Sequence, residues 1–209
     1  MTIALLLVQL AFGDDPPVRS PTSTSAVLLP DRAEYQRLSE EIEKLVTKNA
    51  WVGVENAYLA LLATLVQPTA PDHLSGAHAA RALGDVLSAR TRLIAANALR
   101  EDRAVLDWLF DIDSNYNRVY LACDPNTRTL DAVAMPFDPN QKRAVEFAQA
   151  GIAASGLFDG FLPAGDYQFG DMRIKVEPRV QSVSIDVRSI AWMRELERRA
   201  KKEEKHKDK

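Results

Sequence analysis

The sequence predicts an α+β fold in which a bundle of helices precedes a small antiparallel sheet with one inserted helix, and a C-terminal helix follows. Apolar residues recur every three or four positions in the first half of the chain, which is typical of amphipathic helices. They alternate with polar residues in the second half, and Gly170-Asp171 separates two such segments like a hairpin turn. We therefore expect a helical domain over residues 31–112, a small α+β domain over 113–189, and a helix with a charged tail over 190–209.

The composition is that of an ordinary globular chain. Its 209 residues are 46% hydrophobic and carry a net charge of −3, so no strong positive field attracts nucleic acid. The single cysteine excludes an internal disulfide, and three histidines offer few ligands for a metal site. We expect no nucleic-acid partner, no cofactor and no bound metal.

The first thirteen residues are typical of a short secretory signal. Residues 3–12 form an apolar run of ten, about half the length that a bilayer-spanning helix needs, so no transmembrane span is expected. Ala11 and Gly13 are small residues at the positions where a signal peptidase cleaves, although the segment before the run lacks the usual basic residue. We expect residues 1–13 to be a signal peptide and the protein to be periplasmic or secreted. The alternative is a cytoplasmic chain whose N-terminus is a buried strand.

A linker is expected between this signal and the folded part. Residues 14–30 contain four prolines and a cluster of serines and threonines without periodicity. Such a Pro/Ser/Thr-rich segment is typical of an extended tether.

Helix signals begin at residue 31. Asp31 is a candidate N-cap with Glu34 three residues later, and the apolar spacing predicts a helix over 31–48. A second helix is expected over 51–66, and the residues expected on its buried side are Val54, Tyr58, Leu61, Leu62 and Leu65.

Prolines separate the second helix from the third. Pro68 and Pro71 predict a loop, and Asp72 is then the expected cap of the third helix. Gly84 marks a break before a fourth helix that ends near Leu99.

Aromatic and small residues recur at characteristic spacings in this helical region. Six residues separate Trp51 from Tyr58, with Glu55 at a position between them where a small residue is usual. Further along the chain, two small residues at Ala77 and Ala89 are followed by a large apolar residue at Leu93 and an alanine at Ala96. Residues 31–112 thus resemble tetratricopeptide (TPR) repeats.

This resemblance implies TPR-like hairpins that bind a protein or peptide and do not catalyse a reaction. The candidate partner-binding residues are then Trp51, Glu55 and Tyr58. The alternative is a helical bundle unrelated to TPR repeats.

From residue 117 the periodicity changes to two. Val119, Leu121 and Cys123 alternate with the residues between them, which predicts a half-buried strand and makes Cys123 a buried apolar residue, not a nucleophile. Residues 130–135 are a second candidate strand, and the third element is a helix over 139–155 that begins after Asp138 and stops at Gly156.

The hairpin around Gly170-Asp171 is predicted with its register. If Phe169 faces Met172, then Tyr167 faces Ile174, and these apolar pairs share one side of the sheet. A further strand is expected from the alternation over residues 183–187.

Residues 160–167 read GFLPAGDY ahead of this hairpin. The segment looks like the Leu-Pro-x-Gly-x-Tyr turn of PEGA-type and related small β-sandwich modules in bacterial envelope proteins. The resemblance implies a tight turn at Gly165 and an inward-packed Tyr167, although the helix over 139–155 interrupts a plain sandwich. TPR-like helices followed by such a module are also similar to exported bacterial proteins for which no chemistry is implied.

One segment has the beginning of a calcium-binding loop. Asp111, Asp113 and Asn115 have the D-x-D-x-N order of an EF-hand, but Tyr116 replaces the sixth-position glycine and Ala122 the twelfth-position glutamate. We therefore expect these polar residues to end a helix and begin a strand, and not to bind calcium.

No catalytic set is apparent. His73 and His78 lie about 500° apart around a helix, so their rings should point to different faces. No nucleophile elbow, P-loop, zinc-protease or dinucleotide motif is present. The carboxylates that could pair in three dimensions are scattered: Asp107, Asp111, Asp159 and Asp166.

The final helix is expected to pack against the body and then become a solvated tail. Ser189 is its candidate cap, and Ile190, Met193 and Leu196 are expected to face inward. Residues 194–209 hold eight basic and five acidic side chains, a mixture typical of a solvated helix end.

The sequence therefore favours a non-enzymatic, exported protein-interaction or scaffolding protein of the bacterial cell envelope, with a protein or peptide partner. The alternative is a hydrolase of cell-wall or peptide substrates that uses paired carboxylates at the loops of the β module.

Overall fold

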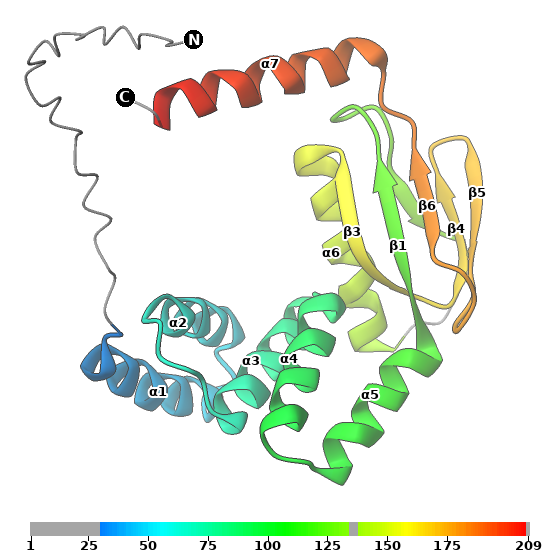
Figure 1. Ribbon diagram of the computed structural model, residues 1–209. Helices are drawn as coiled ribbons and strands as arrows, with labels where there is room; N and C mark the ends of the chain where they lie inside the picture. Colours follow the sequence, from blue (N-terminus) through cyan, green and yellow to red (C-terminus); the bar gives the residue numbers. More distant parts are fainter. Residues whose placement is uncertain (1–29, 134–137, 208–209) are drawn as a thin grey trace, which may run out of the picture.

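A computed structural model describes residues 30–133 and 138–207, with side chains up to residue 199. Five helices are followed by two small sheets, an inserted helix and a C-terminal helix, which confirms the α+β fold class (Figure 1). The predicted signal peptide and nearly all of the predicted tether lie outside the described residues.

Consecutive helices of the N-terminal part pack against one another, and α1 also contacts α3. The five helices are α1 Arg32–Val46, α2 Trp51–Ala63, α3 Ala70–Leu83, α4 Val86–Leu99 and α5 Arg103–Asn115. Small side chains let α3 and α4 approach closely, because Ala77, Ala89 and Ala96 are almost completely buried. The helical part thus continues three residues beyond the expected limit at residue 112 and passes directly into the first strand.

The start of α3 differs from the prediction that Asp72 caps it after a loop containing Pro71. Thr69 is the N-cap, and Pro71 lies in the first turn, where its missing N–H has no intrahelical acceptor in any case. Asp72 is the third helical residue, and its carboxylate accepts a hydrogen bond from the Thr69 N–H at 2.9 Å. Thr69 and Asp72 therefore form a capping box.

The Asp72 carboxylate also joins α3 to α1. It accepts hydrogen bonds from the hydroxyl groups of Tyr35 at 2.6 Å, Ser39 at 2.9 Å and Thr69 at 2.6 Å. Burial raises the pKa of this carboxyl, but the hydrogen bonds outweigh burial and hold the pKa below its usual range.

The buried side of α2 is narrower than predicted. Val54, Tyr58 and Leu61 are buried as expected, but Leu62 and Leu65 are exposed, so their predicted burial is wrong. The helix ends at Ala63, and α1 and α3 cover only the side that carries the three buried residues.

Within residues 30–133 and 138–207, six strands form two three-stranded sheets. The order is β3-β1-β6 in one sheet and β2-β4-β5 in the other. The strands are β1 Tyr116–Ala122, β2 Leu130–Ala132, β3 Leu157–Pro163, β4 Gly165–Phe169, β5 Met172–Val176 and β6 Val183–Asp186. Helix α6, Pro139–Ser155, contacts both sheets through β3 and β2.

One pairing departs from the expected antiparallel arrangement, because β6 runs parallel to β1. The Asn117 side-chain amide donates to the carbonyl oxygens of Glu177 at 2.7 Å and of Val180 and Gln181 at 3.3 Å. These bonds hold the segment before β6 beside the start of β1. Strand β6 therefore begins at the same end of the sheet as β1 and runs in the same direction.

The predicted hairpin register is confirmed. Phe169 pairs with Met172 and Tyr167 with Ile174. Tyr167 is fully buried, and its hydroxyl donates to the Pro163 carbonyl oxygen at 2.7 Å. A single residue separates β3 from β4, which makes the turn before the hairpin tight.

The helical bundle and the β part share a hydrophobic core. One cluster combines residues of α3, α4 and α5 with Tyr116 of β1 and Ala144 of α6. At the end of α3, Gly84 adopts a φ of 90° and faces the α6 backbone so closely that a Cβ atom would overlap the Arg143 carbonyl oxygen. Helix α6 is therefore fixed against the end of α3.

Helix α7, Ile190–Lys207, projects from the end of β6 (Figure 1). Ile190 is 71% exposed, and Met193 and Leu196 are exposed as well, so the prediction that these residues face inward is wrong. Their apolar spacing indicates an amphipathic helix, but no element of the described chain packs extensively on it. No helix among the described residues is long and apolar enough to span a membrane.

Substitution of Gly84 tests the contact between α3 and α6. Gly84→Ala should lower the free energy of unfolding by about 2 kcal/mol, because alanine disfavours this φ and its methyl group displaces α6. The matched change Gly53→Ala, inside α2 and facing the movable end of Leu45, should alter it by less than about 1 kcal/mol. Urea unfolding measures both; equal stabilities of the two variants would contradict this contact.

Candidate functional site

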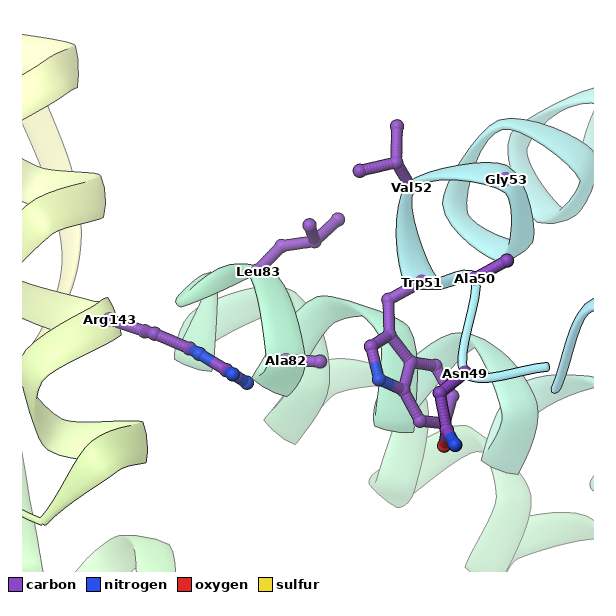
Figure 2. Close-up of a pocket in the computed structure, with 8 residues that line it drawn as sticks. All are labelled: Asn49, Ala50, Trp51, Val52, Gly53, Ala82, Leu83 and Arg143. Carbon is purple, nitrogen blue, oxygen red and sulfur yellow. The ribbon is translucent and has the colours of Figure 1, made fainter. Parts of the chain in front are cut away.

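Two adjoining hollows lie where α2 begins, α3 ends and α6 passes. The first has a volume of about 450 Å³ and the second about 300 Å³, and Trp51, Ala82 and Arg143 line both. We call the combined surface the junction groove; its other lining residues are Asn49, Ala50, Val52, Gly53, His78, Arg81, Leu83, Trp108 and Asn140. Figure 2 shows Arg143 extending from α6 toward the end of α3, with Trp51 beyond Ala82.

Three rings form one wall of the junction groove. The Trp51 and His78 ring centroids lie 6.4 Å apart with planes 28° apart, and those of His78 and Trp108 lie 4.6 Å apart. Burial, together with the positive charge of Arg81, lowers the pKa of His78 below its usual value of 6.5. His78 is therefore neutral at pH 7, and the wall presents aromatic surface from three helices.

Two arginines provide the positive charge of the groove. The Arg81 guanidinium lies 5.2 Å from the Trp108 ring centroid and donates to the Asp111 carboxylate at 3.2 Å. Arg143 has no ion-pair partner among the residues that the structure describes. No acidic side chain lines either hollow, so the groove is apolar with an excess of positive charge.

A buried arginine joins the two helices that carry Trp51 and His78. Arg92 of α4 donates to both carboxylate oxygens of Glu55 on α2, at 2.5 and 2.7 Å, and to the Gly76 carbonyl oxygen of α3 at 2.7 Å. Its guanidinium lies 4.4 Å from the Tyr58 ring centroid. One side chain thus joins α2, α3 and α4, and it sets the position of Trp51 one turn before Glu55.

The three candidate partner-binding residues have different surroundings. Tyr58 is buried, with its hydroxyl 2.8 Å from His73 Nδ1, and Glu55 is engaged by Arg92. Trp51 is partly exposed and lines the groove. Of the three residues, Trp51 alone lines the groove, whereas Glu55 and Tyr58 make contacts within the bundle.

The D-x-D-x-N segment lies at the end of α5 and ties it to neighbouring helices. Asp111 accepts from Arg81, and Asp113 accepts from Arg90 at 2.7 and 3.1 Å, while the Asn115 amide donates to Asp111. Over the described residues, no group of three His, Cys, Asp or Glu side chains is placed to hold a metal ion.

The scattered carboxylates considered for hydrolysis do not gather. Asp107 and Asp111 lie on α5, Asp159 on β3 and Asp166 on β4. The first three form ion pairs with Arg103, Arg81 and Arg118 respectively. Cys123 is buried in the apolar core of the β part. In the described part of the chain, these placements give the hydrolase hypothesis no support.

Sequence reasoning did not identify Arg92, Trp108 or Arg143. The residue that could have indicated a buried cation such as Arg92 is Glu55. It lies one turn from Trp51 and close to one turn from Tyr58, on the same side of α2. A carboxylate at such an inward position needs a buried cation. No comparable pattern marks Trp108 or Arg143, because they come together only when α5 and α6 pack on α3.

No protein-family model matches the chain, and no curated protein or solved structure shows significant similarity to it. The resemblances to TPR repeats and PEGA-type modules stay predictions. The geometry of the junction groove is therefore the basis for the function of the protein proposed below.

Removal of the buried cation should destabilise the bundle. Arg92→Met leaves the Glu55 carboxylate without its partner, and we expect the free energy of unfolding to fall by about 3 kcal/mol. Arg103→Met removes an ion pair whose arginine is 87% exposed and should cost less than about 0.5 kcal/mol. Urea unfolding followed by circular dichroism compares the two variants, and similar losses would show that Arg92 has no special role.

Proposed function

We propose that the protein is a non-enzymatic interaction protein that binds a peptide or protein segment in the junction groove. The observation that carries the proposal is the aromatic wall of Trp51, His78 and Trp108 along an open surface that also presents arginine side chains. Aromatic residues and arginine are enriched at the centres of protein interfaces, because aromatic rings bury a large area with few rotatable bonds and the planar guanidinium forms paired hydrogen bonds.

The rigidity of the groove supports binding. Trp51, His78, Trp108 and Arg143 all lie on helices, and α2, α3 and α4 are joined by the Arg92 network. Binding to a preformed surface avoids the loss of conformational entropy that ordering a loop would require. The groove also contains no nucleophile with an adjacent base and no carboxylate pair among its lining residues, so its residue types suit recognition better than catalysis.

The proposal includes export, on the basis of the apolar run and small residues at the N-terminus. The partner would then be a protein of the bacterial cell envelope, and the protein would act there as a scaffold.

Trp51 provides the most direct test of binding at the groove. A random peptide library selected on the wild-type protein should yield binders whose affinity falls about 30-fold in Trp51→Ala, since truncation of a central tryptophan removes a hot spot. Trp192→Ala on α7, away from the groove, serves as the control and should keep the wild-type affinity. Isothermal titration calorimetry with the selected peptide measures these affinities. Selection of no binder, or equal affinities of wild type and Trp51→Ala, would refute the proposal.

Export predicts a defined mature N-terminus. Expressed in a Gram-negative host, the protein should be recovered from the periplasm beginning at Asp14, because Gly13 precedes the expected cleavage site. Intact mass spectrometry of the purified protein gives the result. A chain that keeps residues 1–13 and fractionates with the cytoplasm would refute export without affecting the binding proposal.

A further inference from the structure

We infer that the segment bound in the junction groove is acidic: a carboxylate binds Arg143, with an apolar or aromatic side chain in the hollow on each side. This inference rests on the proposed function and adds the chemical class of the ligand. It follows from three features of the groove, which are its charge, the position of Arg143 and the walls of the two hollows.

The charge of the groove favours an anionic ligand. Arg143 lacks an ion-pair partner among the described residues, whereas Arg81 is paired with Asp111 at 3.2 Å. His78 is neutral at pH 7 and adds no charge. The groove therefore presents uncompensated positive charge without any acidic lining residue, and a basic segment would be repelled.

Arg143 is the cation best placed to receive a carboxylate. It lines both hollows and so lies between them, whereas Arg81 lines only the second and is stacked on Trp108. In Figure 2 its side chain extends along the groove toward Ala82, with its guanidinium directed away from α6. A guanidinium with free N–H groups binds a carboxylate through two parallel hydrogen bonds.

The walls on either side of Arg143 favour apolar neighbours for that carboxylate. Val52, Leu83 and Trp51 line the first hollow, and the Trp51, His78 and Trp108 rings line the second. Each hollow is large enough for one large side chain, and together they have the size of a typical ligand pocket. A nucleic-acid strand fits the groove less well than an acidic peptide. Two arginines are the cationic side chains among the lining residues, and the whole chain has a net charge of −3.

Fluorescence titration with defined peptides tests the inference. The probe is acetyl-Ser-Leu-Glu-Phe-Ser-amide, and the comparison peptide has Gln in place of Glu. The protein is the full chain carrying Trp192→Phe, which leaves Trp51 and Trp108 of the groove as its tryptophans. Arg143→Gln is the test variant, and Arg103→Gln, an exposed arginine of α5 outside the groove, is the matched control.

The wild-type groove should bind the Glu peptide about fivefold more tightly than the Gln peptide, as expected for a partly exposed ion pair. Arg143→Gln should bind both peptides equally, while Arg103→Gln should keep the fivefold preference. Raising the salt concentration to about 0.5 M should reduce the preference of the wild type.

Four results would overturn the inference. Equal binding of the two peptides by the wild type overturns the acidic ligand, and a Glu preference that persists in Arg143→Gln overturns Arg143 as the residue that binds it; both results leave the proposed function intact. Tryptophan emission that depends on protein concentration without peptide would show that a second copy fills the groove. Absence of binding of both peptides in the millimolar range would overturn the proposed function together with this inference.

Discussion

The ion pair between Arg92 and Glu55 is the interaction on which the arrangement of the helical part depends. The side chains of Arg92 and Glu55 are only 10% and 21% exposed, so their charges must be paired by hydrogen bonds to each other. Arg92 donates a third hydrogen bond, to the Gly76 carbonyl oxygen. Gly76 is necessary here, because a Cβ atom would lie 2.9 Å from the Tyr58 ring over which Arg92 is placed. The side chains that satisfy Arg92 therefore also fix how closely α2 and α3 approach, and with them the position of Trp51.

A second constraint places the groove between the two parts of the chain. The shared core of α3, α4, α5, Tyr116 and Ala144 holds α6 on the bundle, and the left-handed backbone of Gly84 permits the close contact at Arg143. Arg143 consequently faces Trp51 across the end of α3, although the two residues belong to different parts of the sequence (Figure 2). The groove is thus a product of packing between the bundle and α6, and neither part forms it alone.

The elements that local sequence patterns determine were predictable, whereas the junction groove was not. The hairpin register follows from Gly170 and the alternation around Tyr167, and α6 is delimited by Asp138 and Gly156, so local rules suffice. Local rules were misleading at Pro71, which the first turn of α3 accommodates, and at Ile190, whose apolar side is not covered by any element that the structure describes. Of the candidate partner-binding residues, Trp51 lines the groove, but Arg143 and Trp108 reach it through tertiary packing that has no signature in sequence spacing.

We propose the junction groove as the surface on which a partner binds. The indole N–H resonances of Trp51, Trp108 and Trp192 report on it directly, since two of these residues line the groove and the third lies on the projecting helix α7. During titration of ¹⁵N-labelled protein with the acidic peptide, we expect the Trp51 and Trp108 resonances to shift and the Trp192 resonance to stay unchanged. Shifts confined to Trp192, or binding that leaves the two groove resonances unmoved, would contradict the proposal.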